Sequence, residues 1–290
     1  MTVYLRSFTL ASQAQEENFW DFSNPKARRT CYTTCYPFGV FRRREPGTFT
    51  FAPITIFCGG NGSGKSTLLN IIAEALPVQR GTVYNRTDFF GDYIALCAWE
   101  TDALPAGSRI LTSDDVFDHL IGIRELNEGI HQKRAALFEE YTQARHAAVQ
   151  LGSLADYEAF SKVVDAQRKS ASRYVQGRLM DNVPERSNGE SALEFFTGAI
   201  DENALYLLDE PENSLSPQRQ LELKQFLEDS VRFYRCQLVI ATHSPFLLSL
   251  SGAKIYDLDE SPAAVKRWTE LESVRTYSDF FRRHAGEFAK

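Results

Sequence analysis

Short apolar runs and longer helix-like segments alternate along the chain. Residues 54–57 and 205–208 are β-branched or leucine-rich, and each run predicts a buried strand. A third such run opens the segment 237–245. Apolar residues recur at helical spacing over residues 68–76, directly after a glycine-rich stretch, and predict a helix there. The pattern therefore places a strand, a glycine loop and a helix in immediate succession.

A longer helical pattern fills residues 125–176. Its apolar residues step by seven, four, three, four and three positions, close to a heptad seam: Ile130, Leu137, Tyr141, Ala144, Ala148 and Leu151. The pair at 152–153 breaks this seam. A second amphipathic series then follows at Leu154, Tyr157, Phe160 and Val164. We expect a helical hairpin whose arms, of about 25 residues, reach roughly 40 Å at a rise of ~1.5 Å per residue.

Composition and charge set the broad class of the protein. Of 290 residues, 43% are hydrophobic and 24% charged, an ordinary globular balance. The net charge of −6 gives no global field that attracts nucleic acid, so any such contact needs a local basic patch. The five cysteines are scattered and odd in number, which does not fit a secreted disulfide framework. With no signal-like or membrane-spanning apolar run, we expect a cytoplasmic protein without membrane contact.

The glycine-rich stretch reads GGNGSGKST and has the spacing of a phosphate-binding loop. Its glycines let the backbone wrap around phosphates, so that amide N–H groups and a helix N-terminus face the negative charge. Lys65 is expected to reach the β- and γ-phosphates, and the Ser66 hydroxyl to ligate Mg²⁺. The predicted nucleotide-binding residues are Gly59, Gly60, Asn61, Gly62, Ser63, Gly64, Lys65, Ser66 and Thr67.

Two further positions follow predicted strands. The run 205–208 ends in Asp209 and Glu210, where an aspartate can hold Mg²⁺ and a glutamate can polarise an attacking water. The other interpretation is an acidic turn after a core strand. His243 lies just beyond the third strand, where a γ-phosphate contact is needed; the alternative is a structural histidine.

Four motifs in this order carry a resemblance to a known superfamily: GGNGSGKST, RSNGESAL, LLDEPENSLSP and ATHSP. The chain resembles the ABC-type ATPases, and within them the non-transporter branch of SMC, recombination-repair and overcoming-lysogenisation-defect proteins. It looks like the small bacterial "predicted ATPase" proteins of that branch. The resemblance covers roughly residues 50–80 and 180–260 and implies Walker A, signature, Walker B and switch motifs.

The resemblance implies a role for each matching residue. Ser187, Gly189 and Glu190 occupy the signature and would bind the nucleotide of a second copy, in an ATP-dependent homodimer with isologous contacts. Lys65, Glu210 and His243 would be the catalytic residues of Mg²⁺-dependent ATP hydrolysis. The cofactors implied are ATP and Mg²⁺, and the D-loop would contain Ser214, Leu215 and Ser216.

The chain departs from the family pattern at one motif. No glutamine stands in a clear Q-loop setting, and TSDDVF is the expected replacement. There Ser113, Asp114 or Asp115 would approach Mg²⁺ or the attacking water, so Ser66, Asp209 and Asp114 form the predicted metal set. The alternative is a helix N-terminus that starts at Ser113.

Basic residues gather at the C-terminal end of the predicted hairpin: Arg168, Lys169, Arg173 and Arg178. Such a cluster can contact the phosphates of DNA. Acidic residues are mixed in nearby, so a solvated helix face is the other interpretation. A second basic cluster, Arg42 to Arg44, lies in a region that the resemblance implies is a β-rich subdomain that helps hold the nucleotide. A surface β-hairpin is the alternative, and the two are equally consistent with the sequence.

We therefore predict an α/β fold, a P-loop ABC-type ATPase head with an N-terminal antiparallel β-subdomain and a short inserted helical hairpin. The expected divisions are 1–122, with the Walker A half; 123–180, the hairpin; 181–262, with the other three motifs; and a tail, 263–290, packed on the core. The expected role is in DNA repair or anti-phage defence. The alternative is a nucleotide-controlled switch on a separate effector, a toxin or nuclease. A transporter ATPase is disfavoured by the missing Q-loop glutamine and the SNGE signature.

Overall fold

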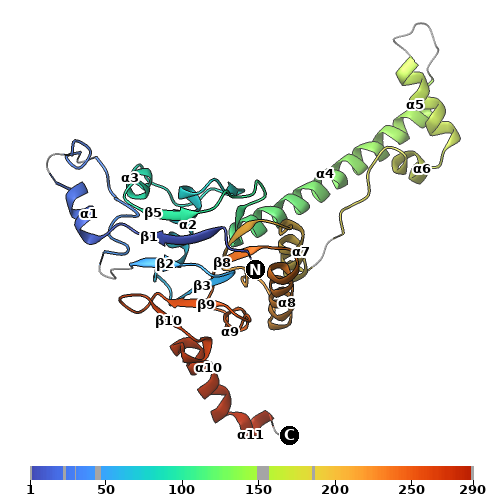
Figure 1. The fold of residues 1–290 in the computed structure, drawn as a ribbon. Coiled ribbons are helices and arrows are strands. Elements are labelled where there is room, and N and C mark those ends of the chain that lie inside the picture. The colour runs from blue at the N-terminus through green and yellow to red at the C-terminus, as the bar shows by residue number, and fades with distance from the viewer. Residues whose placement is uncertain are drawn as a thin grey trace. The chain divides into compact units, whose positions relative to one another are not determined.

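Seven strands form the main sheet, in the order β10-β9-β3-β8-β7-β6-β4 (Figure 1). All neighbouring pairs are parallel except the hairpin of β9 and β10. The strands are β3 (Ile54–Cys58), β4 (Gln79–Arg80), β6 (Arg109–Thr112), β7 (Leu205–Asp209), β8 (Gln237–Ala241), β9 (Lys254–Asp257) and β10 (Ala264–Lys266). The three predicted strands are therefore the adjacent β3, β8 and β7. β8 is fully buried and β7 nearly so, which explains their continuous apolar sequences.

The computed structural model describes residues 2–21, 24–29, 31–42, 47–148, 157–184 and 187–288. The chain divides into two compact units. The first comprises residues 1–116 and 188–290, and the second comprises residues 117–187. In the described part of the chain, none of the helices has a stretch long and apolar enough to cross a membrane.

A second sheet of three antiparallel strands confirms the predicted N-terminal β-subdomain. Its order is β2 (Thr48–Thr50), β1 (Leu5–Thr9) and β5 (Ala98–Thr101). Gln237, fully buried at the start of β8, connects the two sheets. Its Oε1 accepts hydrogen bonds from the N–H groups of Tyr4 and Leu5 at 2.7 and 2.8 Å, and its Nε2 donates to the Leu5 carbonyl at 2.9 Å.

Helices cover the sheets of the first unit. α2 (Lys65–Ala75) buries Leu68, Leu69, Ile71 and Ile72 completely, as their spacing predicts. The other helices are α1 (Gln13–Phe19), α3 (Phe90–Ile94), α7 (Asn188–Ala199), α8 (Pro217–Phe233), α9 (Pro245–Leu248), α10 (Glu272–Arg283) and α11 (Ala285–Phe288), with a 3₁₀ turn, η2 (Trp268–Glu270). Among the described residues of the tail, Leu271 and Val274 are buried.

The second unit contains the predicted helical hairpin. α4 (Ser113–His146) begins in the first unit and continues into the second, followed by α5 (Tyr157–Arg168) and α6 (Ala171–Gln176). The unit has a small core of its own: Tyr141, Ala144, Val163, Ala166, Tyr174 and Val175. The prediction of one continuous second arm is wrong, because Ser170 caps a separate α6 by accepting from the Arg173 N–H. The predicted break at 152–153, Leu151 and Leu154 lie outside the described residues.

Candidate functional site

The site lies at the carboxyl edge of the main sheet. Phe57 of β3 is paired with Ala241 of β8, and Ala241 is paired with Asp209 of β7. Because the strands are parallel and in register, the loops that follow them meet at one edge, where ligands bind in open α/β sheets. Three motifs that are far apart in sequence are thereby brought together.

The phosphate-binding loop has the backbone that its glycines allow. Gly62 and Gly64 adopt φ of 79° and 94°, in the left-handed region. A Cβ on Gly64 would lie 2.9 Å from the Phe41 ring, so this position also needs the missing side chain for space. The Lys65 ammonium donates to the carbonyls of Gly59 and Gly60 at 2.9 and 3.1 Å, which holds it across the loop.

Ser66 and Asp209, two of the three residues predicted to ligate a metal, are in direct contact. The Ser66 hydroxyl donates to Asp209 Oδ1 at 2.9 Å. Burial raises the pKa of Asp209 to about 6; the bond from Ser66 lowers it, and the Glu210 and Glu212 carboxylates raise it. A hydroxyl and a carboxylate are the hard oxygen donors that Mg²⁺ takes beside nucleotide phosphates. The donor set therefore fits Mg²⁺.

Glu210 follows Asp209 in a constrained turn. Its φ is 47°, uncommon for a residue with a side chain. The backbone N–H donates to the Ala241 carbonyl at 2.9 Å, and Oε2 accepts from Asn213 Nδ2 at 3.1 Å. Both contacts fix the carboxylate beside the Walker B strand, where a general base for an attacking water is needed.

His243 lies next to two carboxylates. Its Nδ1 is 3.7 Å from Glu210 Oε1 and 3.4 Å from Glu212 Oε1, while half of the side chain stays exposed. Sequence reasoning did not single out Glu212. The signal that the sequence offers is a second glutamate two positions after Glu210. The adjacent pair Asp209 and Glu210 already accounts for the motif, so this glutamate received no role.

The signature residues begin α7. Ser187 directly precedes the helix, and Arg186 lies outside the described residues. A Cβ on Gly189 would lie 3.1 Å from the Ser214 carbonyl, so the start of α7 packs closely against the D-loop of its own chain. Glu190 pairs with Arg219 of α8 at 3.1 Å.

The segment expected to replace the Q-loop is a helix cap. Asp115 is buried and accepts from the N–H and the hydroxyl of Thr112 at 2.7 and 2.8 Å, and the Asp115 N–H donates back to the Thr112 hydroxyl at 3.3 Å. The cap is therefore Thr112, one residue before Ser113, the expected start of the helix. Thr112 pairs with Asp209 across β6 and β7, so this cap borders the site. The Asp114 side chain, which we expected near the metal, belongs to an exposed residue.

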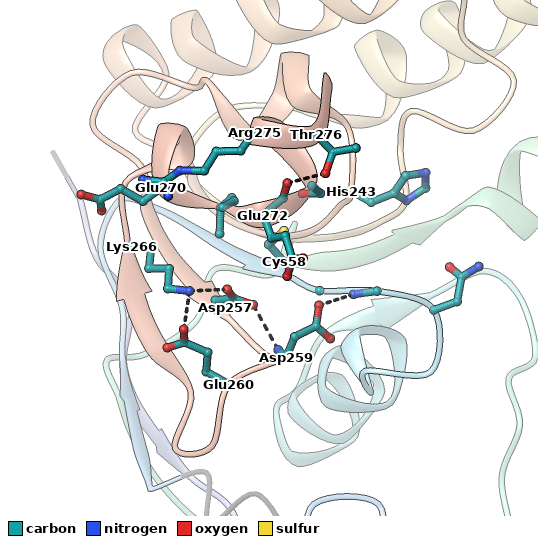
Figure 2. Close-up of a pocket in the computed structure, with 15 residues that line it drawn as sticks. Cys58, His243, Asp257, Asp259, Glu260, Lys266, Glu270, Glu272, Arg275 and Thr276 are labelled. Carbon is teal, nitrogen blue, oxygen red and sulfur yellow. Dashed lines mark hydrogen bonds and ion pairs between the residues drawn. The ribbon is translucent and has the colours of Figure 1, made fainter. Parts of the chain in front are cut away.

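A cavity of about 800 Å³ borders the phosphate loop (Figure 2). Residues of the loop, the β9–β10 hairpin and α10 line it, with His243 at its edge. Asp259 accepts from the Gly60 N–H at 2.7 Å. Nothing in the sequence around Asp259 indicates this contact, because its partner is almost two hundred positions away.

The basic cluster of the second unit is partly neutralised within that unit. Lys169 and Arg178 both pair with Asp165 at 3.1 Å, and the Arg178 guanidinium lies 3.7 Å from the centre of the Tyr174 ring. Arg168 and Arg173 make no ion pair with the residues described. Of the second cluster, Arg42 pairs with Glu17 at 2.7 Å, whereas Arg43 and Arg44 lie outside the described residues.

Comparison with known proteins gives one family and several distant relatives. Residues 176–249 match the family described as "AAA domain, putative AbiEii toxin, Type IV TA system". The thiamine import ATP-binding protein ThiQ of Photobacterium profundum is 25% identical over 194 residues, which cover 66% of this chain and 68% of that protein. The family match contains the signature, Walker B and switch motifs. Together with the similarity to an ATP-binding import protein, it confirms the predicted resemblance to ABC-type ATPases.

Two solved structures are similar at low sequence identity. The Smc head domain of Pyrococcus furiosus, bound to the C-terminal domain of ScpA, is 12% identical and covers 81% of this chain and 95% of its own, with a TM-score of 0.41. The SMC head domain of Thermotoga maritima is 12% identical and covers 91% and 99%, with a TM-score of 0.37. Because these scores are low, the fold rests on the strand order and the phosphate loop.

Proposed function

We propose, from the premise that the chain has the fold and motifs of an ABC-type P-loop ATPase, that it hydrolyses ATP to ADP and phosphate with Mg²⁺. One observation carries this proposal. The Walker A pair Lys65 and Ser66, the Walker B pair Asp209 and Glu210, and His243 come from the ends of three neighbouring parallel strands and meet at one edge.

Each residue has a task in this reaction. Lys65 and the loop amides neutralise the phosphates. Ser66 and Asp209 would hold Mg²⁺, which supplies charge neutralisation at the β- and γ-phosphates when bound. Glu210 orients the attacking water and takes its proton, and His243 contacts the γ-phosphate.

The test is steady-state ATP hydrolysis by Glu210→Gln and by a matched Glu202→Gln, which changes an exposed glutamate of the same unit. Loss of a general base costs about 10²- to 10⁴-fold in turnover. We expect that loss for Glu210→Gln with ATP affinity retained, and unchanged turnover for Glu202→Gln. Wild-type turnover that survives in Glu210→Gln, or that ignores removal of Mg²⁺ by a chelator, would contradict the proposal.

We further propose that ATP closes a homodimer in which Ser187 and Gly189 of one copy face the nucleotide of the other. The position of these residues at the start of α7, where amide N–H groups favour a phosphate, supports this role. Glu210→Gln should therefore dimerise with ATP in light scattering. Adding Gly189→Asp, which places a carboxylate against the γ-phosphate, should keep ATP binding and abolish the dimer. A dimer that persists would rule out this signature contact.

For the cellular role we propose DNA repair or anti-phage defence. The description of the matching family as part of a toxin–antitoxin system favours defence. Of the predicted basic cluster, Arg168 and Arg173 have no ion-pair partner among the described residues, so these two are the members that DNA phosphates would contact. DNA should stimulate hydrolysis at low salt and less at high salt, and the Arg168→Ala, Arg173→Ala double variant should lose this stimulation.

The matched control is Lys133→Ala, an exposed cation on α4 of the same unit. It should retain the stimulation by DNA. Hydrolysis that ignores DNA would favour the second function, a nucleotide-controlled switch on a separate effector protein. The ion pairs that Asp165 makes with Lys169 and Arg178 favour that alternative, because they leave fewer charges for DNA.

A further inference from the structure

Glu212 is a buried carboxylate between the Walker B loop and the switch loop. Its side chain is 4% exposed. Oε1 accepts from the Thr242 hydroxyl at 2.5 Å, from the His243 N–H at 2.9 Å and from the Ser244 N–H at 3.1 Å. Within the described structure, Oε2 is buried without a hydrogen-bond partner. Oε1 therefore accepts hydrogen bonds from three consecutive residues of the switch loop, whereas burial of Oε2 is not compensated by any hydrogen bond among the described residues.

Burial of this carboxyl group costs more free energy than a purely structural contact would require. Burying a carboxylate costs free energy unless all of its lone pairs are satisfied, and here half of them are not. The switch loop also has other anchors. The Thr242 N–H donates to the Phe57 carbonyl at 3.2 Å, and the Ser244 hydroxyl donates to Gln220 Oε1 at 2.6 Å. A carboxyl group is thus buried where neutral groups already hold the backbone.

The Glu212 carboxyl group lies next to the imidazole of His243. Nδ1 of the ring is nearer to Glu212, at 3.4 Å, than to Glu210, at 3.7 Å. This 3.4 Å contact is within ion-pair distance. Because a carboxylate can only accept hydrogen bonds, it favours the tautomer with the hydrogen on Nδ1. The tautomer with the hydrogen on Nδ1 leaves Nε2 available for the γ-phosphate or the attacking water. A carboxylate orients the catalytic histidine of a Ser-His-Asp triad in the same way.

We propose that Glu212 is a positioning residue that fixes the tautomer and the orientation of His243 through Nδ1. The inference rests on the proposed ATP hydrolysis for its effect on turnover, but not for the placement of the ring. Glu212 touches no substrate in this account; it acts through His243.

The ring placement is tested without ATP. Long-range proton–nitrogen NMR spectra report which imidazole nitrogen is protonated, and His243→Ala assigns the signal among the five histidines. At a pH well above the ordinary histidine pKa, we expect the Nδ1–H form in the wild type and a shift toward Nε2–H in Glu212→Ala. An Nε2–H form in the wild type, or the same tautomer in Glu212→Ala, would overturn the proposal.

Two variants guard against a simple loss of folding. Glu212→Gln keeps a carbonyl oxygen for the three loop donors but loses the charge, and it should still lower the Nδ1–H population. Glu228→Ala is the matched control, since Glu228 also accepts from a loop N–H, that of Ser251 at 2.8 Å, away from the site. It should leave the His243 signal unchanged.

A double-mutant cycle then tests the effect on turnover. Loss of an orienting partner costs about 10- to 100-fold in activity, and we expect this loss in kcat for Glu212→Ala with KM little changed. In a His243→Ala background the same substitution should cost less than about two-fold, because residues that act as a unit are not additive. An equal loss in both backgrounds would overturn the proposal. A wild type without turnover but with the expected tautomer would instead contradict the proposed function.

Discussion

The Asp209 carboxyl group gives the site a dependence on pH. Burial raises its pKa to about 6, from an ordinary value of 3.8. Between these values the folded protein holds a proton that the unfolded chain has lost. The contribution of Asp209 to stability is therefore most favourable below pH 3.8 and declines as pH rises toward 6.

We predict that Asp209→Asn removes this decline and raises the Tm at neutral pH in the absence of Mg²⁺. Stabilisation of the wild type by Mg²⁺ and ATP should grow as pH rises through 6, because the metal competes with the proton for the same oxygens. Thermal unfolding across this range checks both results, with the exposed Asp118→Asn as control. An Asp209→Asn variant less stable than the wild type at neutral pH would contradict the assignment.

Gly64 has no tolerance for a side chain. Its φ of 94° and the Phe41 ring at 2.9 Å from an added Cβ both oppose one. We predict that Gly64→Ala distorts the phosphate loop and lowers ATP affinity by about ten-fold or more, since strain of this kind costs about 1–3 kcal/mol. Gly91→Ala, in α3 with open space around it, should leave affinity unchanged. Binding of a fluorescent ATP analogue measures both.

For single residues, the sequence indicates the site residues that belong to local motifs. It does not indicate those whose role depends on contacts with distant parts of the chain. Lys65, Asp209 and His243 each follow a strand in a recognisable pattern, so their meeting could be expected. Glu212 and Asp259 could not be found this way. Their partners lie in other loops, and a lone acidic residue after a strand has no pattern of its own.

The Gln237 side chain connects β8 of the main sheet with β1 of the second sheet through hydrogen bonds to the backbone. Replacing it with leucine would leave the N–H groups of Tyr4 and Leu5 and the Leu5 carbonyl without partners. Each buried group left unpaired costs about 1–3 kcal/mol, so we predict that Gln237→Leu lowers the free energy of unfolding by at least about 3 kcal/mol. Gln225→Leu, on the exposed face of α8, should change it by less than about 0.5 kcal/mol. Urea unfolding measures the free energy of unfolding of both variants. Equal losses would show that the Gln237 side chain does not stabilise the contact between the two sheets.

The helices show which element boundaries can be predicted from the spacing of apolar residues. The seam of the first arm was expected, and Ile130, Tyr141 and Ala144 are buried. The second arm is divided by the Ser170 cap, which periodicity does not register because the apolar spacing continues across it. The start of α4 at Ser113 was expected and is confirmed. The capping role of Thr112 was not expected, since several neighbouring polar residues can all cap a helix.

The second unit has a hydrophobic core of its own, so it should unfold separately from the first unit. Tyr174 is buried in this core, donates to Glu140 at 2.5 Å and lies under the Arg178 guanidinium. We predict that Tyr174→Ala destabilises the second unit by about 3–5 kcal/mol while the first stays folded. Limited proteolysis should then cut within residues 117–187 and spare the rest, whereas Tyr157→Ala, 65% exposed, should not promote cutting. A single cooperative loss of both units would contradict independent cores.

β6 and β7 are neighbours in the main sheet, yet the whole second unit lies between them in sequence. A chain cut inside that unit gives one fragment with Lys65 and Ser66 and another with Asp209, Glu210 and His243. Neither fragment has a complete site, and together they regain one only by re-forming the pairing of β3 with β8 and of β6 with β7. If the chain hydrolyses ATP as we propose, hydrolysis by the mixed fragments would report reassembly. The split protein would then measure how close any two proteins fused to the cut ends have come.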